Sequence, residues 1–320
     1  MSDIVGLVLP FFGLIFIGFF VARISRQPVE ALGWMNTFVI YVALPALFFQ
    51  LLARTPFEEL TEWSFIFGSV FSTYLVFSAM FVASALLSGG EIAESTIKGL
   101  ASAYGNIGYM GPGLAVLAFG EQAAVPVALI FCFENIMHFT IAPMMMALAG
   151  DDKRPLPQLA AGIASRIVLH PFIVATAIGV AAAYFEFRPP VPLERLLSYL
   201  SAAAAPCALF AMGVTLALRP LKRVPHEIAP IAVLKLIVHP LLCYAMLSWI
   251  GHFSETWVFS AVLLAALPTA TNVFVIAQQY GVWVQRASAS ILITTCVSVV
   301  SLTGLLYMIR SGVLPADLFP

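Results

Sequence analysis

Charged side chains are scarce in this chain of 320 residues, and their scarcity excludes most classes of soluble protein. Asp, Glu, Lys and Arg make up 10% of the sequence and hydrophobic residues 61%. Soluble domains contain roughly 25% and 45–50% of these residues, respectively. No polar stretch is long enough for a separate enzymatic or DNA-binding domain. The composition indicates a protein that lies in a lipid bilayer.

Motifs of catalysis and cofactor binding are also missing. The sequence has no His-Glu-x-x-His, no Gly-x-Ser-x-Gly, no phosphate-binding loop with lysine and no basic aromatic face for nucleic acid. Its only cysteines are Cys132, Cys207, Cys243 and Cys296, whose spacing matches no metal motif. We interpret them as apolar packing residues. We therefore expect no enzyme, no resident cofactor or metal, and no nucleic-acid partner.

Long uncharged runs are what the sequence has in abundance. A helix that crosses about 30 Å of hydrocarbon needs about 20 apolar residues, and we find ten such runs. They are Ile4 to Ala22, Trp34 to Ala53, Trp63 to Leu87, Gly99 to Phe119, Ala123 to Ala149, Ile167 to Phe185, Leu196 to Leu218, Ile228 to Ile250, Trp257 to Gln279 and Ala287 to Ile309. The sequence therefore predicts an all-α membrane protein with ten transmembrane helices.

Proline and glycine positions indicate an internal repeat. Six of them recur at an offset of 161: Pro10/Pro171, Gly18/Gly179, Pro28/Pro189, Pro45/Pro206, Gly90/Gly251 and Gly120/Gly281. We interpret residues 1–150 and 161–320 as two five-helix repeats, joined by a cytoplasmic linker at 151–160. An odd number of helices inverts the second repeat in the bilayer. Inverted repeats are typical of transporters, which bind substrate where the repeats meet.

The distribution of Lys and Arg predicts the orientation in the membrane. One face would carry ten of them: Arg23, Arg26, Lys98, Lys153, Arg154, Arg166, Arg219, Lys222, Arg223 and Arg286. The other face would carry Arg54, Arg188, Arg195 and Arg310. By the positive-inside rule, the first face is cytoplasmic and both termini lie outside.

The predicted fourth and ninth helices contain residues that do not suit a spanning helix. Residues 105–113 hold four Gly, one Pro and one Asn, and residues 267–272 combine Pro with hydroxyl and amide side chains. Pro and Gly disfavour helix, and non-helical backbone at this depth is tolerated only where it is buried in protein or lines a cavity. Interrupted helices in matching positions of two repeats indicate a substrate site, although simple proline kinks remain the alternative. The candidate substrate contacts are Asn106, Gly108, Tyr109, Gly111, Pro112, Pro268, Thr269, Thr271 and Asn272.

Ionisable residues inside the predicted helices are candidates for ion coupling, because a buried charge is costly in a bilayer. Glu134 and His138 share a helix face at i, i+4, with Asn135 beside them, and Lys235 and His239 repeat this spacing. A carboxylate beside an imidazole could relay a proton or bind a cation. The alternatives are a structural pair at Glu134 and His138 and a lysine that extends to the interface at Lys235.

The same segments resemble the auxin efflux carrier family, the bacterial relatives of plant PIN-type carriers, over essentially the full length. Residues 106–111 (Asn-Ile-Gly-Tyr-Met-Gly) are similar to the family's fourth-helix element, and residues 266–272 with 277–281 are similar to its ninth-helix element. Residues 205–213 and 234–240 add to the resemblance.

The resemblance implies crossed fourth and ninth helices in two inverted repeats. It also implies a scaffold of helices one, two, six and seven and a mobile transport bundle of helices three, four, five, eight, nine and ten. The implied function is secondary transport of a small organic anion, such as a dicarboxylate or an auxin-like carboxylate, by an elevator mechanism in the bacterial inner membrane. Neutral amides orient a carboxylate without a buried charge, which favours Asn106 and Asn272.

Several alternatives stay open from the sequence. The coupling ion is H⁺ or Na⁺, with Asn272 and Gln278 as candidate Na⁺ ligands, and uniport is also open. A Na⁺-coupled symporter of the bile-acid type would share the crossed-helix fold. A membrane sensor or assembly protein that keeps the fold without transport is a third hypothesis. The partners that we expect are the substrate anion and the lipid bilayer, and a second copy of the chain in a homodimer is a further candidate.

Overall fold

The computed structural model describes residues 2–150, 155–218 and 226–318. Their regular structure is helical, apart from one isolated backbone bridge. In this part of the chain, the helical stretches long and apolar enough to cross a membrane are Gly33–Ala53, Trp63–Leu87, Glu121–Leu148, Val191–Leu218, Ile228–Ile250 and Val284–Arg310. Shorter apolar helices are Phe12–Ser25, Pro171–Tyr184 and Glu255–Ala265. The protein is therefore an all-helical membrane-type protein.

Both helices that carry the unusual proline and glycine segments are interrupted, as the sequence predicts. Helix α5 (Ile92–Ala103) is followed by α6 (Gly111–Phe119), and α13 (Glu255–Ala265) is followed by α14 (Thr271–Tyr280). Pro112 occupies the first turn of α6, where its missing N–H costs no helical hydrogen bond.

Two further helices widen into a π-helical turn next to a proline. The helices joined by these turns are α2 (Gly33–Phe38) to α3 (Leu44–Ala53), and α11 (Ile228–Val233) to α12 (His239–Ile250). Proline lacks an N–H and its ring crowds the carbonyl four residues earlier, so a wider turn absorbs the mismatch before Pro45 and Pro240. The second π-helical turn, Leu234–Val238, carries Lys235.

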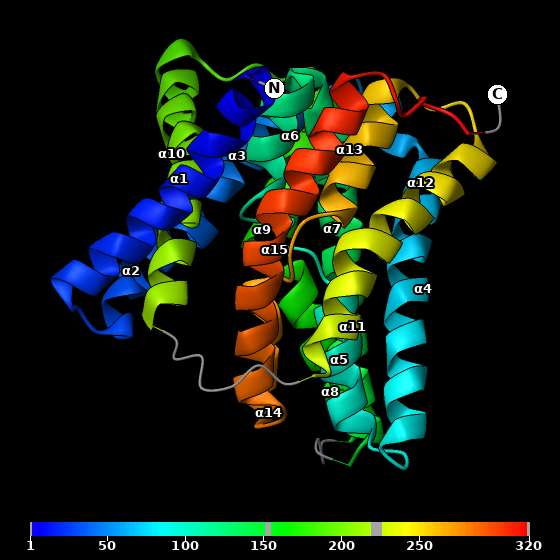
Figure 1. The fold of residues 1–320 in the computed structure, drawn as a ribbon. Coiled ribbons are helices and arrows are strands. Elements are labelled where there is room, and N and C mark those ends of the chain that lie inside the picture. The colour runs from blue at the N-terminus through cyan, green and yellow to red at the C-terminus, as the bar shows by residue number, and fades with distance from the viewer. Residues whose placement is uncertain (1, 151–154, 219–225, 319–320) are drawn as a thin grey trace. The chain divides into compact units, whose positions relative to one another are not determined.

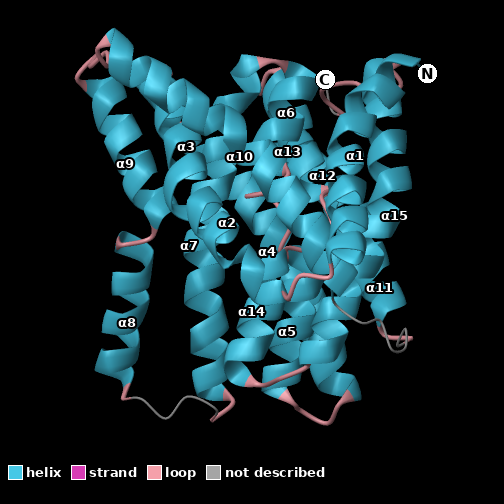
Figure 2. Ribbon diagram, turned by 90° about the vertical axis from the view of Figure 1, so that its left-hand side faces the viewer, coloured by secondary structure: helices cyan, strands magenta, loops and turns pink. Residues whose placement is uncertain are grey.

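One compact unit of the chain comprises Met1–Trp63, Gly108–Cys132 and Leu169–Pro220. Within it, α1 (Ser2–Ser25) lies beside α10 (Val191–Leu218), as Figure 1 shows. In the same unit, α3 lies beside α9 (Pro171–Tyr184), as Figure 2 shows.

Glycines permit the close contact of α1 with α10. A Cβ added at Gly18 would collide with the backbone oxygen of Phe210, and a Cβ at Gly213 would collide with that of Ile15. Because the obstacles are backbone atoms, they cannot move aside as a flexible side chain can. The two helices therefore approach closely only because both positions lack a side chain.

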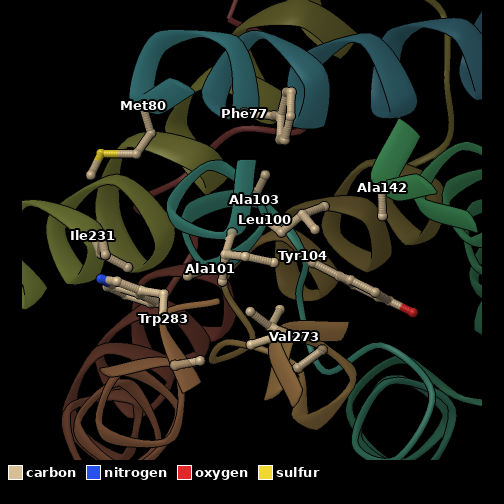
Figure 3. Close-up of a cluster of buried hydrophobic side chains, with 14 of the residues drawn as sticks. Phe77, Met80, Leu100, Ala101, Ala103, Tyr104, Ala142, Ile231, Val273 and Trp283 are labelled. Carbon is tan, nitrogen blue, oxygen red and sulfur yellow. The ribbon is translucent and has the colours of Figure 1, made fainter. Parts of the chain in front are cut away.

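A second compact unit comprises Ser64–Ile107, Phe133–Val168 and Leu221–Pro320. It contains α4 (Trp63–Leu87), most of α7 (Ala124–Leu148), α8 (Leu156–Val168) and α15 (Val284–Arg310), together with α5 and α11 to α14. Its buried apolar cluster gathers around the end of α5. Figure 3 shows Phe77, Leu100, Val273 and Trp283 in this cluster, with Tyr104 at its edge.

Helix α8 is a feature that the sequence analysis did not predict. The expected linker runs over 151–160, and its residues 151–154 lie outside the described part of the chain, but α8 already begins at Leu156. Pro157 suits the first turn of a helix. The helix predicted from Ile167 instead begins at Pro171, because a residue before proline avoids the helical region and His170 has φ −67° and ψ 128°.

Candidate functional site

The two helix breaks are bonded to each other through their backbones. The Asn106 N–H donates to the Pro268 carbonyl oxygen at 2.8 Å, and the Ala270 N–H donates to the Tyr104 carbonyl oxygen at 2.9 Å. The residues between these bonds form the isolated antiparallel bridge. A buried backbone group without a partner is costly, and the two interrupted helices satisfy several such groups in each other.

Side chains and a glycine hold this crossing together. The Thr269 hydroxyl donates to the Ala101 carbonyl oxygen at 2.7 Å, and its N–H donates to the Thr294 hydroxyl at 3.1 Å. A Cβ added at Gly105 would lie 3.1 Å from a backbone oxygen of α13 and 3.2 Å from Lys235 Nζ. The crossing therefore leaves little room for a side chain at Gly105.

A directed chain of hydrogen bonds runs through Tyr104. Its hydroxyl donates to Asn135 Oδ1 at 2.6 Å and accepts from Asn272 Nδ2 at 2.8 Å. Asn135, which the sequence analysis assigned to ion coupling, thus belongs to a chain of amides that ends at the candidate substrate residue Asn272. Asn272 is half-buried, at the start of α14.

A second chain of polar side chains connects three helices. The Thr73 hydroxyl of α4 lies 2.6 Å from Glu134 Oε1 of α7 and 3.0 Å from His239 Nε2 of α12. The other ring nitrogen of His239 lies 3.0 Å from Lys235 Nζ, which donates to the Ala265 carbonyl oxygen at 2.5 Å. Glu134 is thereby linked to Lys235 through a hydroxyl and an imidazole, groups that can both accept and donate a proton.

His138 completes this cluster from α7. Its Nδ1 lies 3.1 Å from the Tyr74 hydroxyl, and its ring stacks on Tyr104 with centroids 3.8 Å apart and planes at 22°. Its Nε2 faces Glu134 Oε2 at 4.0 Å. Neither of these two buried atoms has a hydrogen-bond partner among the residues that the structure describes.

The four ionisable side chains of the cluster, Glu134, His138, Lys235 and His239, are at most 4% exposed. A single buried charge costs several kcal/mol, but one carboxylate and one ammonium in the same network offset each other's charge. Such a network can hold or pass a proton among its members without carrying a net charge. The sequence analysis predicted these four residues; the structure brings them together.

The comparisons with known proteins place the chain among transporters. Residues 3–165 and 158–306 match the family described as "Membrane transport protein". The chain is also 64% identical, over the full length of both proteins, to the "Putative malonate transporter" of Rhizobium meliloti (strain 1021).

The chain belongs to the membrane transport protein family. It is a membrane transporter and not an enzyme, and the resemblance to the auxin efflux carriers is confirmed. More distant relatives match most of the chain. It is 24% identical over 97% of its residues to the "Uncharacterized transporter YfdV" of Escherichia coli (strain K12), which it covers to 99%. It is 22% identical over 90% of its residues to the "Lysosomal cholesterol signaling protein" of Mus musculus, of which it covers 35%.

Other candidate residues are not members of these two hydrogen-bond chains. Gly108, Tyr109, Gly111 and Pro112 belong to the first compact unit. Thr271 is half-buried at the start of α14, next to Asn272. Gln278 is exposed near the end of that helix, six residues beyond Asn272. This spacing puts about 9 Å along the helix axis and about a third of a turn around it between them, so these two side chains do not face one Na⁺ position together.

The sequence analysis did not predict four residues of the polar network described above. They are Thr73, Tyr74, Tyr104 and Thr294. Thr73 and Thr294 also bond to a carbonyl of their own helix, which is the ordinary behaviour of hydroxyls in apolar helices and gives no signal in the sequence. Tyr104 could have been found from the sequence, since it immediately precedes Gly105-Asn106 at the start of the unusual segment.

A separate cleft of about 250 Å³ lies in the first compact unit, between α3 and the start of α10. Gln50, Arg54, Arg188 and Glu194 line it, and Arg54 forms an exposed ion pair with Glu194 at 2.6 Å. None of the candidate substrate residues lines it. In the described part of the chain, no group of three or more His, Cys, Asp or Glu side chains is arranged to hold a metal ion.

Proposed function

We propose that this protein is a secondary transporter for a small dicarboxylate such as malonate. The observation that carries the proposal is the bonded pair of helix breaks, with a tyrosine that holds the amide of Asn272 beside them. Amide N–H groups and the start of α14 suit a carboxylate without a fixed counter-charge. The name of the Rhizobium meliloti relative, at 64% identity, supports malonate as the first substrate to test.

The proposed architecture is a ten-helix fold of two inverted five-helix repeats, residues 1–150 and 161–320. The recurrence of six proline and glycine positions supports it, and so does the presence of a break in both α5/α6 and α13/α14. Substrate would then bind where the two breaks meet, with Asn106 and Asn272 as its amide contacts.

The proposed mechanism is of the elevator type. The scaffold would contain α1, α2, α3, α9 and α10, which correspond to the predicted helices one, two, six and seven, and the transport bundle would contain the remaining helices. The division of the chain into two compact units supports this assignment, since the first unit holds these scaffold helices. Residues Gly108–Cys132 also belong to that unit, which differs from the division that the sequence analysis expected.

We propose H⁺ as the coupling ion. Glu134, His138, Lys235 and His239 form a buried network of groups that exchange protons, and the ammonium of Lys235 would repel a second cation in the same place. Na⁺ coupling of the bile-acid-symporter type is the alternative, with Asn272 as its remaining candidate ligand. The dependence of uptake on a pH gradient and on Na⁺, described below, distinguishes these two coupling ions.

A membrane sensor that binds ligand without transport is a second candidate function. The one observation in its favour is the 22% identity to a mouse protein whose printed name describes cholesterol signalling. Binding of a ligand by purified protein with no flux in proteoliposomes would support the sensor. We also propose that the protein lies in a bacterial inner membrane with both termini outside. A homodimer is a further proposal.

The proposed function is tested by uptake of radiolabelled malonate into proteoliposomes that contain the purified protein. We expect uptake that a pH gradient stimulates and that replacement of Na⁺ by K⁺ does not change. Uptake that requires Na⁺ would favour the symporter alternative. Absence of both uptake and binding for malonate and related dicarboxylates would overturn the proposed substrate class.

A further inference from the structure

Tyr104 stands where α5 ends, and its backbone is fixed at the crossing of the two breaks. Its N–H donates to the Leu100 carbonyl oxygen at 2.8 Å, and its own carbonyl oxygen accepts from Ala270. The side chain is 1% exposed. Figure 3 shows it leaving the apolar cluster, with the hydroxyl pointing away from Met80 and Trp283. The ring thus extends from a fixed anchor into the polar part of the unit.

The hydroxyl of Tyr104 orients the amide of Asn272. Its single hydrogen is engaged by Asn135 Oδ1, so toward Asn272 the hydroxyl oxygen can only accept. The nitrogen of the Asn272 amide, rather than its oxygen, must therefore face Tyr104. An amide nitrogen carries two hydrogens, and the bond to Tyr104 leaves the second one to donate to a carboxylate.

The ring of Tyr104 covers the imidazole of His138. The stacked geometry, 3.8 Å between centroids, places the imidazole over the aromatic face. An aromatic face attracts a cation, so the ring favours the protonated form of His138. The other titratable or charged groups that surround His138 come from α4, α7 and the helix α11 to α12: Tyr74, Glu134, Lys235 and His239, with Cys243 close to Lys235.

We propose that Tyr104 is a positioning residue shared by the substrate site and the proton site, whose hydroxyl aims Asn272 at the substrate carboxylate and whose ring supports protonation of His138. The inference rests on the proposed function, because it names how carboxylate recognition and proton coupling are held together. The hydroxyl and the ring of Tyr104 have separate roles in this proposal, so a substitution that removes only the hydroxyl differs in effect from one that removes the ring as well.

The test compares Tyr104→Phe with Tyr104→Leu in proteoliposomes, with the KM for malonate and the pH profile of uptake as readouts. We expect Tyr104→Phe to raise KM by about tenfold, since it removes one oriented hydrogen bond to a group that binds an anion, and to leave the midpoint of the pH profile unchanged. We expect Tyr104→Leu to raise KM and also to lower that midpoint by about half a pH unit, the size of an aromatic–cation contact. Tyr307→Phe, which removes a half-exposed hydroxyl from α15, is the matched control and should change neither value.

A measurement without substrate separates failure of this inference from failure of the proposed function. The titration of His138, followed by NMR in ¹³C-histidine-labelled protein and assigned with His138→Gln, should shift in Tyr104→Leu and stay in place in Tyr104→Phe. Tyr104→Met replaces Tyr104→Leu if the latter does not purify as a single species. Equal effects of the Phe and Leu variants on this titration overturn the ring's role, and an unchanged KM in Tyr104→Phe overturns the hydroxyl's role. A wild type that neither binds nor moves dicarboxylates overturns the proposed function together with the hydroxyl's role, while the titration still decides the role of the ring.

Discussion

Glu134 Oε2 and His138 Nε2 face each other at 4.0 Å, one turn apart on α7, and neither atom has a hydrogen-bond partner within the described residues. The second oxygen of Glu134 is held by Thr73, so the carboxylate is fixed with one oxygen directed at the imidazole. A proton shared at this position would be near the polar network and away from solvent. This relationship makes the pair the most direct candidate for proton coupling.

The first prediction concerns this pair. Glu134→Gln keeps the shape of the side chain and the bond to Thr73 but cannot lose or gain a proton at physiological pH. We expect the variant to bind malonate with unchanged affinity and to lose the pH dependence of uptake. Binding is measured by isothermal titration calorimetry and uptake in proteoliposomes between pH 5 and 8. Glu121→Gln, at an exposed position before α7, is the control. Loss of binding, with the pH profile of the residual uptake unchanged, would assign Glu134 to recognition or to the fold.

The second prediction concerns Asn272. Removal of an amide that donates to a carboxylate costs about 1.5–3 kcal/mol, so Asn272→Ala should raise the KM for malonate by about tenfold or more. Asn272→Asp should raise it further, because the new carboxylate repels the anionic substrate. Gln278→Ala on the same helix, at an exposed position, should leave KM unchanged. Equal effects at the two positions would argue against a specific contact at Asn272.

The sequence predicted the crossing helices better than the network around them. Gly and Pro at mid-helix have few structural explanations, so residues 105–113 and 267–272 predicted both breaks, which are confirmed. The spacing of Glu134 with His138 and of Lys235 with His239 identified four members of the buried cluster. Helix α8 was not predicted, because residues 156–168 have too few consecutive apolar residues to resemble a membrane span.

The missing part of the site consists of hydroxyl groups. Thr73 and Tyr74 lie in a segment that resembles an ordinary apolar helix, and their roles arise from contacts between residues far apart in the chain, such as Thr73 with His239. A single sequence contains no information on which of many helical hydroxyls will face a carboxylate on another helix. Periodicity gives the face of one helix, whereas the partner across the interface comes only from the fold.

The third prediction concerns the contact of α1 with α10. A valine at Gly18 would collide with the backbone of α10 at Phe210, and overpacking of this kind costs about 1–3 kcal/mol. Gly18→Val should therefore lower the unfolding temperature of the purified protein. Gly13→Val is the matched control on the same helix, because a Cβ there meets no atom within 4 Å. Unfolding is followed by intrinsic fluorescence in detergent, and similar melting of both variants would contradict the close contact.

The fourth prediction concerns orientation in the membrane. The asymmetry of Lys and Arg puts the connection at Phe57–Thr61 outside and the connection between α4 and α5 in the cytoplasm. In a variant without native cysteines, an impermeant maleimide added to intact cells should label Glu59→Cys and should label Ser88→Cys only after lysis. The reverse pattern would invert the proposed topology. Labelling of both cysteine variants in intact cells would contradict the assignment of the two connections to opposite sides of the membrane.

The last prediction concerns a charge network at one end of α5, outside the predicted span that begins at Gly99. Lys98 Nζ lies 2.7 Å from Glu94 and 2.9 Å from Glu227, and Arg286 lies 2.8 Å from Glu227. Burial by itself would lower the pKa of Lys98, but its hydrogen bonds to the two carboxylates raise that pKa above its ordinary value of 10.5.

A raised pKa in the folded state means that the Lys98 contribution to stability is fully present below pH 10.5 and is lost as the pH rises through the folded-state pKa. Glu227→Gln should therefore lower the free energy of unfolding by about 1 kcal/mol between pH 6 and 9, a modest value because Glu227 and Arg286 are partly exposed. The difference from wild type should narrow as the pH rises above about 10.5 and through the raised pKa of folded Lys98. Denaturant unfolding at pH 7 and at pH 11 measures both values, with the exposed Glu62→Gln as control. A difference that stays constant through this range would show that Lys98 does not contribute through its charge.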